Sequence, residues 1–241
     1  MSRLIGAVQF LTILPVRGKG APPGECALFF PLIGVAVAAA GSRLFLFFDY
    51  FLGGAMAALL VVAFWSWIGG GLHEDGVADV ADAFRGHRSP SKIVAILKDS
   101  RIGAYGALAL IFLVAIRWQA MQRMPADPIR ELAACFALSR AAMVTMGWIT
   151  RPVGDGLAAM FASGLTSTGA LIAIGTGVAF AWLAGPQLGV FLIALAALVT
   201  WMLREWFEAR LGGVNGDCLG ATCLIVETVL MGVASCRNCF W

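Results

Sequence analysis

Residues 53–72 read GGAMAALLVVAFWSWIGGGL, a stretch without one charged side chain. A helix of this length rises about 30 Å, which is the thickness of the hydrocarbon core of a bilayer. The next residues, 73–82, read HEDGVADVAD and contain four acidic side chains. An apolar stretch that can cross a membrane therefore ends at a cluster of carboxylates. This junction predicts a membrane fold with a site at the membrane surface.

Apolar stretches of similar length recur along the whole chain. Of its 241 residues, 60% are hydrophobic and 13% are charged, whereas soluble domains are about one half apolar and one quarter charged. Because a chain in lipid must satisfy its own backbone polar groups, we expect these stretches to be helices. The sequence thus predicts an all-α, polytopic transmembrane helix bundle of about seven spans, forming one integral membrane domain over residues 1–241. The candidate spans are residues 27–48, 53–72, 104–122, 131–150, 167–184, 187–203 and 221–236.

The N-terminal stretch, residues 4–14, is also apolar but is too short to cross a bilayer, and it ends at Pro15. We expect an interfacial or re-entrant helix there. No small-residue cleavage site follows it, so we expect the segment to be retained rather than removed as a signal peptide.

Basic residues are distributed unevenly between the two faces that seven spans define. If segments 1–26, 74–103, 151–166 and 204–220 share one face, that face carries eleven Lys and Arg residues and the other face carries three. The positive-inside rule then places the first face in the cytoplasm, and an odd number of spans places the C-terminus outside. The net charge is only +3, without a block of consecutive basic residues. Nucleic-acid binding is therefore not expected.

The acidic segment has the spacing of a helix face. Its acids are Glu74, Asp75, Asp79 and Asp82. The three aspartates are spaced i, i+4 and i+7, so a helix presents them on one side, where like charges repel unless a cation lies between them. Hard oxygen ligands without cysteine suit Mg²⁺ or Mn²⁺. The alternative is a solvated face with salt bridges to Arg85 or Arg88. We favour a metal site because the chain has only 14 acids.

A basic segment follows, reading KDSRIGAYG at residues 98–106. Lys98 and Arg101 lie three residues apart, beside a hydroxyl and before a glycine-rich helix start, a composition suited to holding phosphate oxygens. Such residues also anchor lipid head groups at a membrane edge. Beside the acidic helix, phosphate binding is the favoured interpretation. The candidate phosphate-binding residues here are Lys98, Asp99, Ser100 and Arg101.

A third polar segment, GGVNGDCLGA at residues 212–221, lies on the same predicted face. Asn-Gly-Asp is typical of a tight turn. Asp217, at the mouth of the last span, would complete the metal site, and Asn215 is a candidate substrate contact. Glu227 lies further into that span, where an ionisable group is costly and usually functional.

Two further residues have open interpretations. His73, one of two histidines, is either a general base or hydrogen-bond partner of a phosphate, or a packed and satisfied histidine. Arg140, if it faces the bundle interior, needs an anionic partner, which is either the substrate or an acid of the protein.

The six cysteines show no spacing that indicates a disulfide framework or a zinc site. The one Cys-x-x-Cys pair, Cys236 and Cys239, has no second pair or histidine near it. We interpret these residues as small apolar side chains.

A carboxylate helix that binds a metal, nearby cations and a membrane surface together predict transfer of a phosphate-containing group. Such chemistry asks little covalent work of the protein, because cations neutralise the developing charge and hold nucleophile and leaving group in line.

Three motifs, residues 70–82, 98–106 and 212–221, resemble those of the cobalamin synthase family, also called adenosylcobinamide-GDP ribazoletransferases. Supporting pieces are FLTILPV at 10–16, FPLIG at 30–34 and LSRA at 138–141. The likeness runs in the same order from residue 10 to about residue 227. The family usually has Thr at the position of Asn215 and Gly at that of Ala83, and neither difference removes a charge.

This resemblance implies an Mg²⁺-dependent enzyme of the bacterial inner (plasma) membrane with its active site on the cytoplasmic face. It would join adenosylcobinamide-GDP to α-ribazole, or its 5′-phosphate, and release GMP. The lipid membrane and these substrates are the expected partners, and an oligomer is allowed. The expected catalytic residues are His73, Asp75, Asp79 and Asp82. The expected metal ligands are Glu74, Asp75, Asp79, Asp82 and Asp217. The expected substrate contacts are Lys98, Asp99, Ser100, Arg101, Arg140 and Asn215.

Two alternatives remain at this stage. Residues 75–79, Asp-Gly-Val-Ala-Asp, also resemble the Asp-Gly opening of the CDP-alcohol phosphotransferase motif, a lipid head-group transferase. That motif continues with Arg where this chain has Asp79. A transporter would place acids near the span centres, whereas here nearly all lie in predicted loops.

Overall fold

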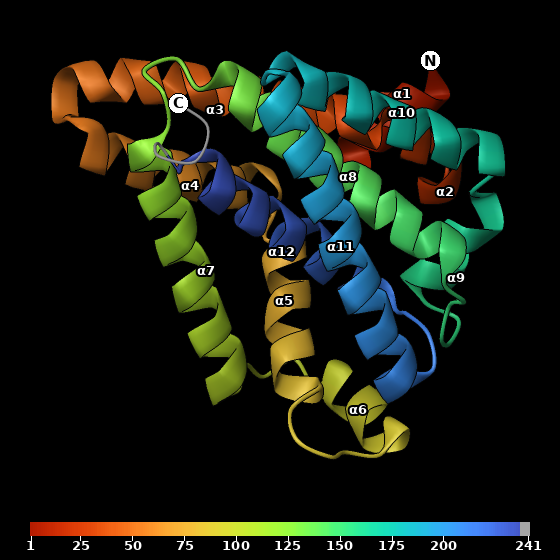
Figure 1. The fold of residues 1–241 in the computed structure, drawn as a ribbon. Helices are drawn as coiled ribbons and strands as arrows, with labels where there is room; N and C mark the ends of the chain where they lie inside the picture. The colour runs from red at the N-terminus through yellow and green to blue at the C-terminus, as the bar shows by residue number, and fades with distance from the viewer. Residues whose placement is uncertain (237–241) are drawn as a thin grey trace.

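The computed structural model describes residues 1–236 as a bundle of α-helices (Figure 1). Among these residues there is no strand, only an isolated bridge between Pro152 and Val214. The prediction of an all-α fold is confirmed. In chain order the helices are α1 Ser2–Leu11, α2 Pro23–Cys26, the 3₁₀ helix η1 Ala27–Phe29, α3 Phe30–Leu52, α4 Gly54–Ile68, α5 Leu72–Ala83, α6 Pro90–Leu97, α7 Ala104–Arg123, α8 Ile129–Ile149, α9 Leu157–Gly164, α10 Ser167–Leu183, α11 Pro186–Leu211 and α12 Gly216–Ala234.

Five helices of the described chain are long and apolar enough to cross a membrane, and the number rises to seven if two bent pairs each count as one span. The five are the continuous unit Pro23–Leu52, α7, α8, α11 and α12. The pairs are α4 with α5, bent by 89°, and α9 with α10, bent by 98°. The predicted bundle of about seven spans is confirmed, with two of them broken. Within the first pair, α4 is the apolar part and α5 carries four acids.

Two segments predicted as loops are helical instead. Helix α11 continues to Leu211 rather than ending at residue 203, because Arg204 pairs with Glu208 one turn further on, at 2.7 Å. Helix α12 begins at Gly216 rather than at residue 221, since the Asn215 side chain accepts a hydrogen bond from the Cys218 amide and caps it. The last span is therefore 19 residues long, enough to cross a bilayer.

Three consecutive glycines, residues 69–71, make the bend between α4 and α5. Gly70 and Gly71 have φ angles of +63° and +70°, which favour glycine because it has no Cβ. The chain therefore turns sharply at the end of the apolar stretch. Helix α5 then runs beside α7 and packs against α12 (Figure 1).

Helix α8 forms the centre of the bundle and packs against α3, α10 and α12. Of its apolar window 83% is buried, compared with 28% for α7 and α11. Small residues such as Ala133, Ala134 and Ala137 let neighbouring helices approach α8 closely. The outer faces of α7 and α11 instead expose large apolar side chains, including Phe112 and Trp201, as lipid-facing helices do.

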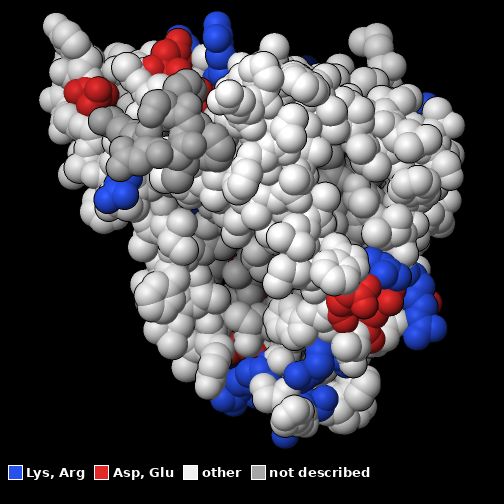
Figure 2. Space-filling model, viewed as in Figure 1, with Lys and Arg blue, Asp and Glu red and all other residues white. Residues whose placement is uncertain are grey.

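Charged side chains lie mainly at the ends of the molecule, and most of its visible surface is uncharged (Figure 2). Lys and Arg gather at the end that carries α6 and the end of α11 (Figures 1 and 2). This is the surface expected of a bundle with its apolar band in lipid and its charges in water.

Four cysteines, Cys26, Cys135, Cys218 and Cys223, are free and buried, which agrees with their interpretation as small apolar residues. Cys236 is disulfide-bonded, so that interpretation is wrong for it, because spacing alone does not report the redox state of a pair. Cys239 lies outside the described residues.

Candidate active site

The acidic segment is helical as predicted, and α5 presents its aspartates on one face. Asp75 is exposed, whereas Asp79 and Asp82 are partly buried. Glu74 and Asp75 occupy the first turn of the helix, where the helix dipole stabilises negative charge. The local sequence therefore favours a helix beginning at this point.

A close crossing of α5 and α12 brings Asp217 to the acidic face. A Cβ at Gly76 would lie 2.7 Å from the backbone oxygen of Asp217 and 3.2 Å from the amide nitrogen of Ala221. Only glycine permits this approach of two helix backbones. The first and third motifs thus form one surface because Gly76 lies between Asp75 and Asp79.

The loop before α12 fixes Asp217. The Asn215 amide nitrogen donates to Asp217 Oδ2 at 2.6 Å, while Asn215 Oδ1 accepts from the Cys218 amide at 3.0 Å. Two backbone hydrogen bonds of Val214, with Arg151 and Val153, hold this loop against the segment that follows α8. The side chain of Asn215 is therefore a cap and a positioning group within the protein.

Like charges dominate the electrostatics of this face. Burial, and after it the neighbouring carboxylates Asp75, Asp217 and Asp82, together raise the pKa of Asp79 to about 6. Within residues 1–236, none of these four aspartates forms an ion pair with Lys or Arg. The acidic face therefore carries negative charge that the protein itself does not balance.

The predicted alternative, salt bridges from Arg85 or Arg88 to this face, is wrong. Arg85 stacks over the ring of Tyr105, 4.8 Å from its centroid. Arg88 donates to the backbone oxygens of Asp82 and Ala83 and so caps the end of α5. Both cations therefore have other partners: Arg85 the ring of Tyr105 on α7, and Arg88 the backbone at the end of α5.

Asp82 connects the acidic helix to the basic segment. Its Oδ2 accepts a hydrogen bond from the amide of Gly103 at 2.7 Å, and Gly103 is the N-cap residue of α7. The carboxylate thus satisfies a free amide at a helix N-terminus and also favours the helix dipole. This contact holds the segment 98–103 next to α5.

The two basic residues of that segment, Lys98 and Arg101, lie in different surroundings. Lys98 lines the pocket described below. Arg101 is 87% exposed and binds Asp99, with Nη2 2.7 Å from Oδ2. These hydrogen bonds lower the pKa of Asp99 to about 2. The structure therefore brings Lys98 to the site but leaves Asp99, Ser100 and Arg101 outside its walls.

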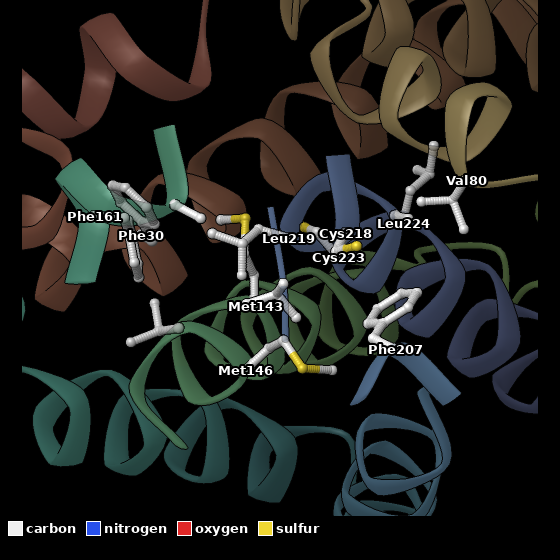
Figure 3. Packing of buried hydrophobic residues seen from close by; sticks show 14 of the residues in the cluster. Phe30, Val80, Met143, Met146, Phe161, Phe207, Cys218, Leu219, Cys223 and Leu224 are labelled. Carbon is white, nitrogen blue, oxygen red and sulfur yellow. The ribbon is translucent and has the colours of Figure 1, made fainter. Parts of the chain in front are cut away.

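A pocket of about 590 Å³ opens beside the acidic face, a size typical of small-molecule sites. Its polar wall consists of His73, Asp75, Lys98, Asp155, Asn215 and Asp217. Its apolar wall includes Met143, Phe161 and Leu219, which belong to the packed cluster in Figure 3. The three predicted motifs thus meet at one cavity, while Asp79 and Asp82 lie outside its lining.

Sequence reasoning missed Asp155 as a pocket residue. Asp155 lies in a Gly-Asp-Gly turn at residues 154–156, and the pairing of Val153 with Val214 brings that turn to the third motif. The glycines on either side of Asp155 indicate a turn. The sequence near this turn does not indicate that the turn contacts the third motif.

Four charged side chains form a second group, which we call the buried charge cluster: Glu74, Arg117, Arg140 and Glu227. Glu227 is fully buried and accepts hydrogen bonds from Arg117, at 2.6 Å, and from Arg140. Glu74 lies 3.6 Å from Arg117 and accepts a hydrogen bond from Ser66 at 2.6 Å.

This cluster corrects two predicted roles. Glu74 does not face the aspartates, because the residue before Asp75 projects from a different side of α5. Arg140 has a protein partner, Glu227, and is almost fully buried, so it is not placed at the pocket. Burying the charge of Glu227 is unfavourable, and the two arginines that bind it offset this cost.

His73 lies between the pocket and the cluster and is buried. Burial, and after it the positive charges of Arg140 and Arg117, together lower the pKa of its imidazole to about 3. The ring is therefore neutral and a weak proton acceptor at neutral pH. Its Nε2 has no hydrogen-bond partner among the described residues.

A model of the family described as cobalamin-5-phosphate synthase matches residues 3–235. The chain belongs to the cobalamin-5-phosphate synthase family. A relative from Geotalea daltonii, named adenosylcobinamide-GDP ribazoletransferase, is 31% identical over 235 residues, or 93% of each chain. A relative of the same name from Sinorhizobium medicae is 36% identical over 246 residues, covering 94% of this chain and 93% of its own. No solved structure gave a significant match.

Membership of the cobalamin-5-phosphate synthase family confirms the resemblance carried by the three motifs, because the matched residues include all of them. The alternative assignment to the CDP-alcohol phosphotransferases is not favoured. Arg at the position of Asp79 would be needed for that motif, and Asp79 is instead part of the acidic face.

The donor set fits the Mg²⁺ that the cobalamin-5-phosphate synthase resemblance implies. Four carboxylates without a protein cation supply hard oxygen ligands of the right kind. Among residues 1–236, no three Asp, Glu, His or Cys side chains are arranged to hold one ion directly. Mg²⁺ usually keeps several waters and uses one or two carboxylates plus substrate phosphate oxygens, so a more open acidic face suits it.

Proposed function

We propose that this chain joins adenosylcobinamide-GDP to α-ribazole, or to α-ribazole 5′-phosphate, and releases GMP. Relatives that carry the name adenosylcobinamide-GDP ribazoletransferase are 31% and 36% identical to it over 93% and 94% of its length. The observation that supports the proposal best is the convergence of three motifs on one pocket: His73 and Asp75, then Lys98, then Asn215 and Asp217.

In the proposed reaction, the 3′-hydroxyl oxygen of the ribazole attacks the phosphorus next to the aminopropanol arm of the cobinamide. A new phosphorus–oxygen bond forms. The bond between this phosphorus and the oxygen that it shares with the GMP phosphate breaks, and GMP leaves with that oxygen. The hydroxyl proton passes to a carboxylate of the acidic face.

We assign the proton to a carboxylate rather than to His73. The pKa of His73 is lowered to about 3, so its imidazole is a weak proton acceptor at neutral pH. A general base works best when its pKa lies near the working pH. The neutral imidazole of His73 is instead suited to a hydrogen bond with the substrate.

Mg²⁺, when bound, would neutralise charge on the diphosphate and hold it in line. Asp75, Asp79, Asp82 and Asp217 are the residues that would hold it. Lys98 at the pocket wall would offer a point charge to a phosphate oxygen. Asn215 would keep Asp217 oriented through its 2.6 Å hydrogen bond.

We place the pocket on the cytoplasmic face of the bacterial inner membrane. Lys98 and the pocket loops belong to the face that carries eleven of the basic residues against three on the other. Nucleotide-activated substrates are also made in the cytoplasm, so a pocket facing inwards suits them.

Purified protein in nanodiscs tests the proposal. Incubation with adenosylcobinamide-GDP, Mg²⁺ and either α-ribazole or its 5′-phosphate should release GMP and form the ribazole adduct, and EDTA should stop both. A parallel incubation with CDP-diacylglycerol and an alcohol acceptor should release no CMP. CMP release without GMP release would sink the assignment.

A further inference from the structure

The buried charge cluster joins four helices at the place where α5 begins. Glu227 lies on α12, Arg117 on α7, Arg140 on α8 and Glu74 on α5. The Arg117 guanidinium also lies over the ring of Trp65, 5.3 Å from its centroid. Two cations and two anions give no net charge. The cluster is thus internally balanced, in contrast to the acidic face.

Filling a core with charged side chains is energetically less favourable than filling it with apolar ones. Charges taken out of water lose more solvation than an apolar replacement would, and buried ion pairs contribute little net stability for that reason. Arg117 is 1% exposed and Glu227 is 0% exposed. The interior of a membrane protein makes this cost larger. The presence of four charges here therefore indicates a task beyond stability.

The cluster is connected to the pocket through α5. Glu74 precedes Asp75, which lines the pocket, and His73 lines both the pocket and a small cavity beside the cluster. That cavity has a volume of about 20 Å³, which is room for one water. Among the described residues, His73 Nε2 and Arg117 Nε and Nη1 are buried without hydrogen-bond partners. A water there would accept from Arg117 and bond His73.

We propose that the buried charge cluster positions the start of the acidic helix, with Glu74 and His73 as its two contacts. Glu74 is held by Arg117 and Ser66, and His73 by a water shared with Arg117. These contacts fix the rotation of α5, so Asp75 faces the pocket. Arg117 and Glu227 are positioning residues, and Glu74 is one too rather than a metal ligand. The inference rests on the proposed function only for its activity measurement.

Kinetics of the full chain give the first test. Glu74→Gln and Arg117→Gln should each lower kcat by about 10- to 100-fold, as loss of groups that orient ligands does, while both KM values stay within about twofold. Arg117→Lys keeps the charge and should recover part of the loss. The double variant should be no slower than the slower single variant, because both remove one contact.

Asp127→Asn is the matched control. It breaks the Arg43–Asp127 pair, 2.6 Å apart and exposed, which does not line the pocket. It should leave kcat and both KM values unchanged. Unchanged kcat in folded Glu74→Gln would overturn the proposal, as would losses that multiply in the double variant.

Hydrogen exchange gives a test that does not depend on turnover. In the absence of substrate, the amides of residues 72–83 should exchange faster in Glu74→Gln and Arg117→Gln than in the wild type, and at the wild-type rate in Asp127→Asn. If the wild type fails to release GMP, the proposed function fails while this measurement still decides the inference. Equal exchange in all four proteins would refute it.

Discussion

The carboxylate of Asp79 lies in surroundings that destabilise its charged form. Burial and three neighbouring carboxylates raise its pKa to about 6, and no Lys or Arg of residues 1–236 pairs with it. The ionised form is therefore disfavoured in the folded protein. Active sites commonly carry such strain, which a ligand of opposite charge relieves.

Asp79→Asn should raise the melting temperature at pH 8 without divalent metal and lower GMP release by about 100-fold or more. The folded pKa of about 6 lies above the ordinary 3.8, so the folded state binds this proton more tightly. Wild-type stability must then fall as the pH rises through this range. The thermal gain of the variant should be present at pH 8 and absent at pH 4.

Asp49→Asn provides the comparison for that variant. Asp49 is exposed and does not line the pocket, so its replacement should change neither the melting temperature nor GMP release. A lower melting temperature for Asp79→Asn than for the wild type at pH 8 would contradict the electrostatic account.

Asp82 combines two tasks that two substitutions separate. Asp82→Asn keeps an oxygen that can accept from the Gly103 amide, whereas Asp82→Ala removes it. Both variants should lose GMP release. Only Asp82→Ala should also lose about 1 kcal/mol of stability, the usual value of a helix cap. Thermal unfolding of the two variants side by side measures this, and equal stabilities would contradict the capping role.

At the scale of helices, the crossing of α5 and α12 makes the site. Residues 76 and 217 are far apart in the sequence, yet a side chain as small as methyl at Gly76 would meet the backbone of Asp217 at 2.7 Å. Backbone cannot move aside as the end of a flexible side chain can. The distance between the two acidic motifs is therefore set by one glycine.

Gly76→Ala should push the two helices apart, lowering kcat at least tenfold and stability by about 1–3 kcal/mol, as overpacking does. Gly175→Ala is the control, because a Cβ there has no neighbour within 4 Å and alanine favours a helix. GMP release and thermal unfolding of both variants test this. Wild-type activity in Gly76→Ala would mean that α5 and α12 need not be so close.

The helices and their motifs were largely predictable from the sequence, because apolar length and the i, i+4, i+7 spacing of Asp75, Asp79 and Asp82 are local properties. The sequence did not predict which charged side chains would pair with one another. Glu74 was expected among the metal ligands and Arg140 among the substrate contacts, but they face Arg117 and Glu227, which lie on helices distant in the chain. Arg101 binds Asp99. The sequence shows that Asp99 is nearby, but it does not show whether Arg101 binds this carboxylate or a phosphate.

At the scale of the whole molecule, Glu227 connects α12 to α7 and α8. Glu227→Ala removes the carboxylate that two buried arginines bind and should cost about 3–5 kcal/mol of stability. Asp127→Ala, which breaks the exposed pair with Arg43, should cost at most about 1 kcal/mol. Reversible unfolding in mixed micelles compares them. Similar losses in the two variants would show that burial does not matter here.

The place of Asp217 and Glu227 on α12, the last helix that the structure describes, has a consequence for biosynthesis. Arg117 of α7 and Arg140 of α8 are synthesised before Glu227, the buried carboxylate that both of them bind. Until that helix is made, both arginines lack Glu227, and the pocket lacks Asp217. A chain that stops before residue 216 would therefore lack both a wall residue of the pocket, Asp217, and the acid that balances the two buried arginines, Glu227.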